Sequence, residues 1–235
     1  MNIIKEINKI TNLTILREII EKYNYGTESN FILENNKMKL SLEESITQIF
    51  EEIYIPLNLH KKNKIKILDI GSGFCHNNLI CKALGHECHN IEKPSREDVT
   101  GYESNLYGHF HKILNLKNVE YYEIKGPEIK LKNKNRYDFI FILNPTFNEQ
   151  EKNDELYLWG IEEWKKCFKR LHNNLTEEGK IIIGWGKGSI SDDSFLNNWN
   201  KYKNNKVLKH IQNKNVDFFR KNVEYKVFTR FCLKA

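Results

Sequence analysis

The stretch from Ile67 to His76 reads ILDIGSGFCH, and it carries more information than any other part of the chain. An apolar run ends at Asp69, and Gly71 and Gly73 follow it one residue apart. A short, continuous apolar run is typical of a strand covered on both faces of a parallel sheet. Glycine lets the chain turn tightly and lets a ligand approach the backbone. We therefore expect a strand, then a glycine turn against a ligand, then a helix.

The composition is that of an ordinary globular protein. The chain has 235 residues, of which 40% are hydrophobic, enough for one α/β domain with a real core. No apolar run approaches the roughly 18 residues of a membrane span, so no membrane partner is expected. The five cysteines are an odd number without a disulfide rhythm, which predicts a reduced, cytoplasmic protein. The net charge of +6 is scattered, which favours solvated loops over a nucleic-acid-binding stripe.

Residues 1–63 are predicted to form a helical cap. The segment 3–23 repeats apolar residues at three- and four-residue spacing, which gives a helix one apolar face. The segment 41–54 opens with Ser41 and Glu44, the spacing of a capping box. In a capping box each of the two side chains satisfies a free backbone N–H at the helix start.

From residue 64 onward, short apolar runs alternate with helical segments. This alternation predicts a doubly wound, Rossmann-like α/β sheet with right-handed crossovers. Strands are expected at 64–70, 86–92, 119–124, 137–143 and 180–185, and helices at 77–85, 102–116 and 159–175.

The C-terminal tail follows a different pattern. A helix is predicted over 194–212, followed by strands over 216–222 and 224–234. The connection between these strands is too short for a parallel crossover, so the last strand should lie antiparallel to its neighbour. No repeat or linker interrupts the chain. Residues 64–235 are therefore expected to form one domain, in a single compact unit with the cap.

An acidic residue stands where a ribose-binding carboxylate is expected. Glu92 ends the second predicted strand, and a carboxylate there can accept both hydroxyl hydrogens of a ribose. The order of strand, glycines, helix, strand and acid predicts an adenosine-containing ligand. A nicotinamide-dependent oxidoreductase would favour a third glycine where His76 stands, and it remains an alternative. S-adenosylmethionine has no phosphates and does not require that glycine.

The stretch ILDIGSG resembles the first motif of class I S-adenosylmethionine-dependent methyltransferases. The resemblance spans residues 64–235 and implies a seven-stranded sheet whose last strand is antiparallel, with a variable N-terminal cap. It implies an enzyme that transfers a methyl group from S-adenosylmethionine and releases S-adenosylhomocysteine. Within this resemblance Glu92 would bind the ribose, and Asp69 would accept a hydrogen bond from the amino group of the cofactor or from a water. The implied cofactor-binding residues are Asp69, Gly71, Ser72, Gly73, His76, Glu92 and Asn144.

The predicted fourth strand is followed by NPTF at 144–147. This stretch resembles the N-P-P-Y/F motif of amino-methyltransferases, in which the asparagine accepts hydrogen bonds from a target NH₂ group. It implies an alternative function, N-methylation of a nucleic-acid base. Thr146 departs from the motif, and an ordinary Asn-Pro turn after a strand explains the stretch as well. In both cases Asn144 is expected to line the pocket as a catalytic residue.

The helix that begins WGIEEW resembles a bacterial subgroup with a W-x-x-x-E-W pattern. This resemblance implies a small-molecule acceptor, a hydroxyl of a sugar or sugar nucleotide in carbohydrate biosynthesis; nucleic acid is the weaker alternative partner. Methyl transfer to a hydroxyl needs alignment, a dry site and a base, and histidine suits the base role. His109 is the candidate, with Tyr107, His111 and His76 nearby. Residues two apart on a helix point to different sides, so His109 and His111 should not both face one pocket.

Three tryptophans are candidates for a wall of the acceptor site, namely Trp159, Trp164 and Trp185. A packed core explains Trp164 equally well, because Phe168 lies four residues further along the same helix. The cysteines and histidines between 75 and 89 lack the paired spacing of a zinc site, so no metal is expected. A catalytically silent cofactor-binding subunit, acting as a scaffold for a partner, is a further alternative.

Overall fold

The computed structural model describes most of the chain in two compact units. The described residues are 1–18, 42–92, 102–121, 124, 126–129, 131, 135–143, 149–152, 155–159, 161–185, 209–211 and 224–229. The first unit comprises Met1–Ile65 with Ser72–Tyr122, and the second comprises Lys66–Gly71 with Glu123–Ala235. These units cut across the predicted boundary between a cap and a domain at residues 63 and 64.

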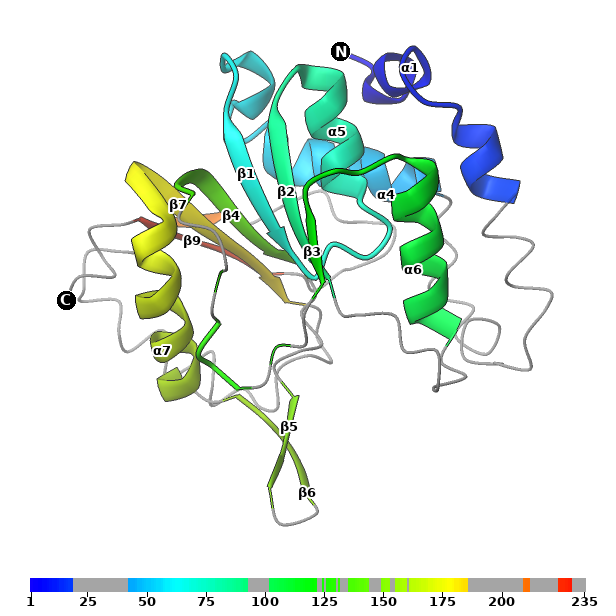
Figure 1. Cartoon of the computed structure of the whole chain (residues 1–235). Coiled ribbons are helices and arrows are strands. Elements are labelled where there is room, and N and C mark those ends of the chain that lie inside the picture. Colours follow the sequence, from blue (N-terminus) through cyan, green and yellow to red (C-terminus); the bar gives the residue numbers. More distant parts are fainter. Residues whose placement is uncertain are drawn as a thin grey trace. The chain divides into compact units, whose positions relative to one another are not determined.

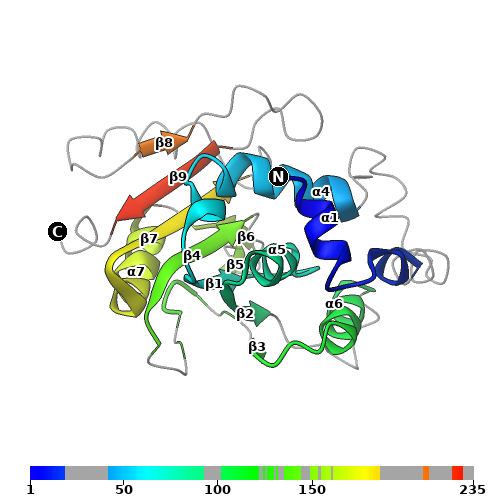
Figure 2. The same ribbon diagram turned by 90° about the horizontal axis from the view of Figure 1, so that it is seen from above.

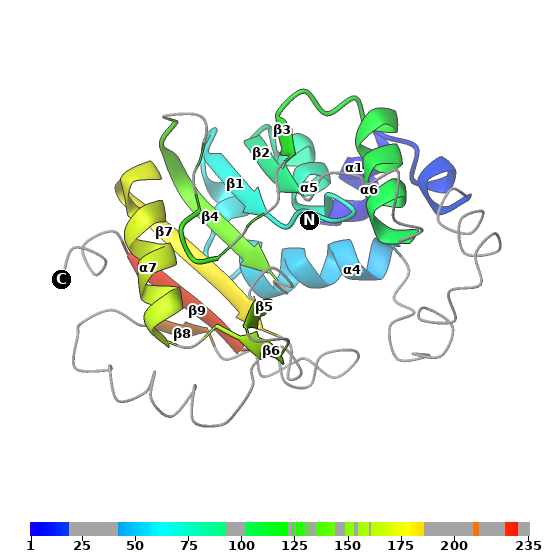
Figure 3. The same cartoon turned by 60° about the horizontal axis from the view of Figure 1, so that its bottom comes forward.

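Helices of the predicted cap pack on the first helix after the glycine turn. In the first unit, α1 (Ile3–Asn8) and α4 (Leu42–Ile49) lie beside α5 (His76–Leu84), as Figures 1 and 3 show. The predicted helix of the cap continues beyond α4 as a π-helix, Phe50–Tyr54. The Tyr54 hydroxyl lies 3.3 Å from the Cys81 sulfur of α5. This packing explains why the N-terminal helices group with α5 in one compact unit.

The strands of the first unit are β2 (Glu87–Glu92) and β3 (Val119–Tyr121), and they pair with each other in parallel. Helix α6 (Tyr102–Ile113) connects them in the sequence. Helix α5 ends at Gly85, which takes the left-handed conformation with φ +75°. Glycine has no Cβ to penalise that conformation, which is why it stops helices so often. The helices predicted at 77–85 and 102–116 and the strands predicted at 86–92 and 119–124 are confirmed, with β3 shorter than expected.

The second unit is built on a sheet in the order β1-β4-β7-β9-β8. The strands are β1 (Lys66–Ile70), β4 (Tyr137–Leu143), β7 (Leu175–Trp185), β8 (Lys209–Ile211) and β9 (Glu224–Thr229). The pairs β1–β4 and β4–β7 are parallel, whereas β9 runs antiparallel to β7 and to β8. Figure 2 shows β4, β7 and β9 side by side. Together with β2 and β3, five strands take part in parallel pairings, which confirms the Rossmann-like α/β class.

Apolar side chains fill the second unit from both the sheet and α7 (Ile161–Leu171). On β4, Phe139–Ile142 are all buried, as are Ile181–Ile183 on β7, so these strands are covered on both faces. Helix α7 buries one stripe at helical spacing, formed by Trp164, Cys167, Phe168 and Leu171. The alternation of strands and helices in the sequence therefore places the central strands correctly.

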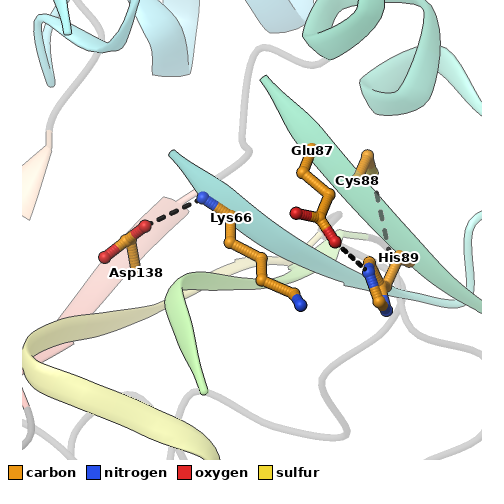
Figure 4. Close-up of polar contacts among 5 residues, drawn as sticks. All are labelled: Lys66, Glu87, Cys88, His89 and Asp138. Carbon is orange, nitrogen blue, oxygen red and sulfur yellow. Dashed lines mark hydrogen bonds and ion pairs between the residues drawn. The ribbon is translucent and has the colours of Figure 1, made fainter. Parts of the chain in front are cut away.

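A bulge distorts the start of the β4–β7 pairing. Tyr137 pairs with Leu175 and Phe139 with Lys180, so β7 uses three more residues than β4 over this stretch. Asp138 lies at this point and accepts a hydrogen bond from the Lys66 backbone N–H at 2.8 Å (Figure 4). It accepts a second one from the Thr176 hydroxyl at 3.3 Å. The carboxylate thereby ties the beginnings of β1, β4 and β7 together.

Two features of the second unit differ from the prediction. A two-stranded antiparallel hairpin, β5 (Glu149–Lys152) and β6 (Glu155–Leu158), was not predicted from the sequence. Its first strand, EQEK, is polar and its second, ELYL, is short, so neither alternates clearly, and the local signal is the pair Asn153-Asp154, of types that favour turns. The helix predicted over 194–212 is wrong at its end, where β8 pairs with β9, because strand pairing overrides local helix periodicity.

Several predicted features lie outside the described residues. They are the capping residue Ser41, the rest of the helix before 209, and the strand at 216–222. Among the described residues, no helix combines the length and apolar character needed to cross a bilayer.

Candidate functional site

The glycine turn after β1 holds three residues with positive φ. Gly71 has φ +77°, Gly73 +49° and Cys75 +58°. A residue with a Cβ is strained in this region by about 1–3 kcal/mol, and such strain gathers at functional sites. Cys75 adopts this conformation although it has a Cβ, and its side chain is fully buried at the start of α5. The sharp turn predicted from the spacing of the two glycines is confirmed.

Backbone N–H groups of the turn donate within the chain. The Ser72 N–H donates to the Ile91 carbonyl at 3.3 Å, and the Cys75 N–H donates to the Ser72 carbonyl at 2.8 Å. The Gly73 N–H donates to the Glu92 carboxylate at 2.6 Å. These three donors, which a phosphate at this turn would need, are therefore engaged by the protein itself.

Glu92 ends β2 with its carboxylate on the turn. The same oxygen, Oε2, lies 3.4 Å from the Ser72 hydroxyl, which donates to it, and Glu92 is 9% exposed. A hydrogen bond from a backbone N–H to a carboxylate is roughly twice as strong as one between neutral groups. The acid predicted at the end of the second strand is thus fixed beside the glycines, as a ribose-binding carboxylate would have to be.

Helix α6 lays one face over the turn. The Tyr107 ring lies beside Gly73, where a Cβ built on the glycine would come within 3.6 Å of the ring. The Phe74 ring meets Tyr107 edge-on at 4.9 Å and Phe110 at 5.2 Å. His111 is four residues beyond Tyr107 and therefore lies on the same helix face. The turn is thus covered by aromatic side chains of α6.

His111, on α6, forms a hydrogen bond with the turn directly. Its Nε2 lies 3.1 Å from the Gly73 carbonyl oxygen, and its Nδ1 lies 2.7 Å from the Tyr121 hydroxyl. A carbonyl only accepts, so Nε2 carries the proton and Nδ1 accepts from the tyrosine O–H. The side chain is 2% exposed, and burial lowers the pKa of His111, although its bond to Gly73 opposes this. The imidazole is therefore held neutral in one tautomer.

Tyr121 ends β3 at the edge of this network. It is 40% exposed, yet its hydroxyl reaches inward to His111. Burial raises the pKa of Tyr121, and the nearby Cys75 and Glu92 side chains, in their ionised forms, raise it further. The phenol therefore stays protonated and serves as a donor. No sequence motif marks Tyr121, because its role depends on which residue of α6 lies opposite.

The structure gathers part of the predicted cofactor set. Ser72, Gly73 and Glu92 are in direct contact, and His76 begins α5 with its ring 6.0 Å from Phe74. Asp69 is 3% exposed on β1 and pairs in register with Phe141. Its role toward a cofactor stays a prediction, as does that of the exposed Gly71.

The predicted catalytic residues are not placed by the structure. Asn144 lies outside the described residues, and so does the side chain of His109 within α6. The histidine that reaches the turn is His111, which sequence reasoning treated as a secondary candidate.

The tryptophan pattern is explained by packing. Trp159 and Trp164 are buried and meet edge-on at 5.1 Å, and Trp164 lies 5.7 Å from Phe168. This packing places both side chains in the core of the second unit, and a role of either at an acceptor site stays a prediction. The side chain of Trp185 is outside the described residues.

No metal site is evident in the described part of the chain. It contains no group of three histidine, cysteine or acidic side chains able to hold an ion. His89 of β2 instead lies 2.6 Å from Glu87 on the same strand (Figure 4). The described cysteines, Cys75, Cys81, Cys88 and Cys167, are free thiols and buried.

Comparison with known proteins finds similarity at the level of solved structures. No family model and no curated protein matches the chain. A methyltransferase dependent on S-adenosylmethionine from Aquifex aeolicus is 17% identical, with 80% of this chain and 96% of that chain covered and a TM-score of 0.47. A TehB-like S-adenosylmethionine-dependent methyltransferase from Corynebacterium glutamicum is 14% identical, with coverages of 79% and 96% and a TM-score of 0.45.

A further similar structure is the N-methyltransferase NodS from Bradyrhizobium japonicum, in complex with S-adenosyl-L-homocysteine. It is 9% identical, covers 91% of this chain and 97% of its own, and gives a TM-score of 0.47. At identities this low and TM-scores below one half, the function of this chain has to be judged from its own residues.

Proposed function

We propose that this protein is an S-adenosylmethionine-dependent methyltransferase acting on a small molecule. The observation that carries the proposal is the hydrogen bond of 2.6 Å between the Gly73 N–H and the Glu92 carboxylate. It joins the glycine turn and the acid at the end of β2, which are the two parts of an adenosine-binding site. A tight turn without a ligand would not require a buried carboxylate at this position.

The same bond argues against a pyrophosphate ligand. Dinucleotide sites offer free backbone N–H groups at the turn to a doubly charged pyrophosphate. Here the N–H groups of Ser72, Gly73 and Cys75 are engaged by acceptors of the chain itself. His76 stands at the third glycine position, at the start of α5. A nicotinamide-dependent oxidoreductase is therefore the weaker alternative.

The arrangement of the second unit supports the same family. After the parallel strands β1, β4 and β7, its sheet continues with β9, which runs antiparallel to β7. An antiparallel last strand is what the resemblance of ILDIGSG to class I methyltransferases implies.

The residues of this chain fit the cofactor by their chemistry. Glu92 would accept hydrogen bonds from the ribose hydroxyls, and the turn at Gly71–Gly73 would hold the amino-acid part together with Asp69. His76 would border the same cofactor, and Asn144 would lie at the acceptor pocket, facing the methyl group. When bound, the cofactor supplies an electrophilic methyl group, and the protein contributes alignment and the exclusion of water.

For the acceptor, we propose a hydroxyl of a sugar or sugar nucleotide, with Asn144 at the pocket and His109 as the base. The support is the resemblance of the W-x-x-x-E-W helix. Packing of Trp159 on Trp164 accounts for the two tryptophans of that pattern.

A cytoplasmic location is proposed from the free thiols of the described cysteines. N-methylation of a nucleic-acid base, suggested by the NPTF stretch, is the alternative for the acceptor.

The first test is calorimetric titration with S-adenosylhomocysteine, and with NADH as the comparison. We expect micromolar binding of S-adenosylhomocysteine and none of NADH. Binding of NADH alone would contradict the proposal. Release of S-adenosylhomocysteine from S-adenosylmethionine is then measured with sugar nucleotides and, separately, with oligonucleotides. Turnover with oligonucleotides alone, weakened by salt, would replace the proposed acceptor with the alternative.

A further inference from the structure

We propose that His111 is a positioning residue, which holds the Gly73 peptide in the conformation in which the glycine turn binds the cofactor. This inference rests on the proposed function for its ligand, but its structural basis is independent of it. None of the sequence patterns assigns His111 to this task.

Gly73 is held on both sides by side chains. Its N–H donates to Glu92 at 2.6 Å, and its carbonyl accepts from His111 at 3.1 Å. The N–H belongs to the peptide before Gly73 and the carbonyl to the peptide after it. The relative orientation of these two peptides is what φ and ψ of the residue describe. Glu92 and His111 together therefore fix the conformation of Gly73.

The hydrogen bonds of Glu92 and His111 to Gly73, here called the Gly73 clamp, are needed because the residue is glycine. Glycine adopts positive and negative φ with about equal ease, so the chain by itself does not select the observed value of +49°. The Tyr107 ring gives Gly73 only ordinary van der Waals contact, which limits space but fixes no angle. Without His111 the turn would sample other conformations, and a ligand would have to order it on binding.

Tyr121 sets the direction of the clamp. By donating its O–H to Nδ1 at 2.7 Å, it leaves the single imidazole proton on Nε2, where Gly73 needs a donor. Without this hydroxyl the proton could move to Nδ1, and the Nε2 lone pair would face the carbonyl. The titratable groups around the pair are Tyr121 itself, Cys75 and Glu92. On α6 itself, the neighbouring Lys112 is exposed.

The experiment uses the full-length protein with four variants. His111→Phe keeps a ring but no donor, His111→Gln keeps an amide N–H at the Nε2 position, and Tyr121→Phe removes the orienting hydroxyl. His60→Phe is the matched control, because the His60 ring also lies against a backbone carbonyl, that of Tyr54 at 3.3 Å. Circular dichroism checks that each variant is folded.

The first readout is affinity for S-adenosylhomocysteine at several pH values. We expect His111→Phe to lose about tenfold in affinity, the effect of one hydrogen bond, and His111→Gln to recover most of it. Tyr121→Phe should fall between them, and His60→Phe should bind normally. Because the imidazolium keeps its Nε2–H, protonation of His111 should not by itself release Gly73, and acid should weaken binding no more steeply in the wild type than in His111→Phe.

The second readout needs no ligand. Long-range ¹H–¹⁵N spectra should show the Nε2–H tautomer of His111, and hydrogen exchange should show a protected Gly73 amide that loses protection in His111→Phe. Wild-type affinity in His111→Phe, or an Nδ1–H tautomer, would overturn the inference. If the wild type fails to bind S-adenosylhomocysteine but the tautomer and the protection are as expected, the proposed function falls and the clamp of Gly73 stands.

Discussion

The Glu92 carboxylate accepts a hydrogen bond of 2.6 Å from the backbone N–H of Gly73, 19 residues earlier in the chain. The contact joins the end of β2 to the turn that follows β1. It holds the acid in place before any ligand arrives, so the site does not have to be assembled on binding. Preorganisation of this kind raises affinity because less conformational freedom is lost.

Removal of the Glu92 carboxylate should weaken cofactor binding. We expect Glu92→Ala to lower the affinity for S-adenosylhomocysteine by about 10- to 100-fold, since hydrogen bonds to a charged group contribute about 1.5–3 kcal/mol. Glu92→Gln keeps an acceptor for Gly73 and should lose less. Glu87→Gln is the control on the same strand, where Glu87 pairs with His89. Normal binding by Glu92→Ala, measured by calorimetry, would move the cofactor elsewhere.

Asn144 should matter for turnover and not for cofactor affinity. We expect Asn144→Ala to bind S-adenosylhomocysteine within about twofold of the wild type, which is less than one hydrogen bond contributes. Its rate of methyl transfer should fall at least about tenfold, because positioning of the acceptor is lost. Asn174→Ala, which removes a bond of 3.1 Å to the Asn135 carbonyl, is the control. A loss of affinity would assign Asn144 to the cofactor side.

Gly179 should tolerate no side chain. A Cβ there would lie 2.9 Å from the Thr176 nitrogen and from the Tyr137 carbonyl oxygen, at the bulge between β4 and β7. Backbone atoms cannot move aside easily, so Gly179→Ala should destabilise the fold by about 1–3 kcal/mol. Urea unfolding measures the loss. Gly85→Ala is the comparison, since its Cβ would meet nothing within 4 Å and only the strain of φ +75° applies.

Acid should destabilise the protein through its buried histidines. The His86 Nε2–H donates to the Leu59 carbonyl at 3.1 Å, and Nδ1 is buried without a hydrogen-bond partner. Burial lowers the pKa of His86 below its ordinary value of 6.5, although the bond to Leu59 opposes this. The unfolded chain therefore takes up the proton first, and stability falls as the pH drops below 6.5.

The test compares the unfolding free energy of the wild type and of His86→Gln between pH 7.5 and 5. Glutamine keeps a donor for Leu59 but does not titrate, so its stability should fall less steeply. His111 acts in the same direction, because burial also lowers its pKa, and the double variant should be the least pH-dependent. Equal slopes for all three proteins would contradict the prediction.

The described cysteines should be unreactive in the folded protein. All four are buried, and burial raises the pKa of Cys167 far above the usual range, so its thiolate is scarcely populated. Alkylation by iodoacetamide, mapped by mass spectrometry, should spare these four thiols until denaturant is added. Rapid labelling of Cys167 in the native protein would show that α7 does not bury it as described.

Much of the fold could be predicted from the sequence because it depends on local chemistry. The apolar run before Asp69 gave β1, Gly85 ended α5, and the helical spacing of Trp164 and Phe168 gave the buried stripe of α7. The β5–β6 hairpin was missed and β8 was predicted as helix, because weakly patterned strands form only where a partner strand lies beside them.

The sequence by itself determined the order of the elements, the glycine turn and the presence of an acid at the end of β2. Period and turn conformation are properties of neighbouring residues, so a sequence displays them directly. Only the tertiary structure decided that Glu92 bonds Gly73 and that His111, 38 residues from Gly73, bonds the same glycine. The first contact depends on the packing of β2 beside the turn and the second on the packing of α6 over it, and neither packing is a property of neighbouring residues.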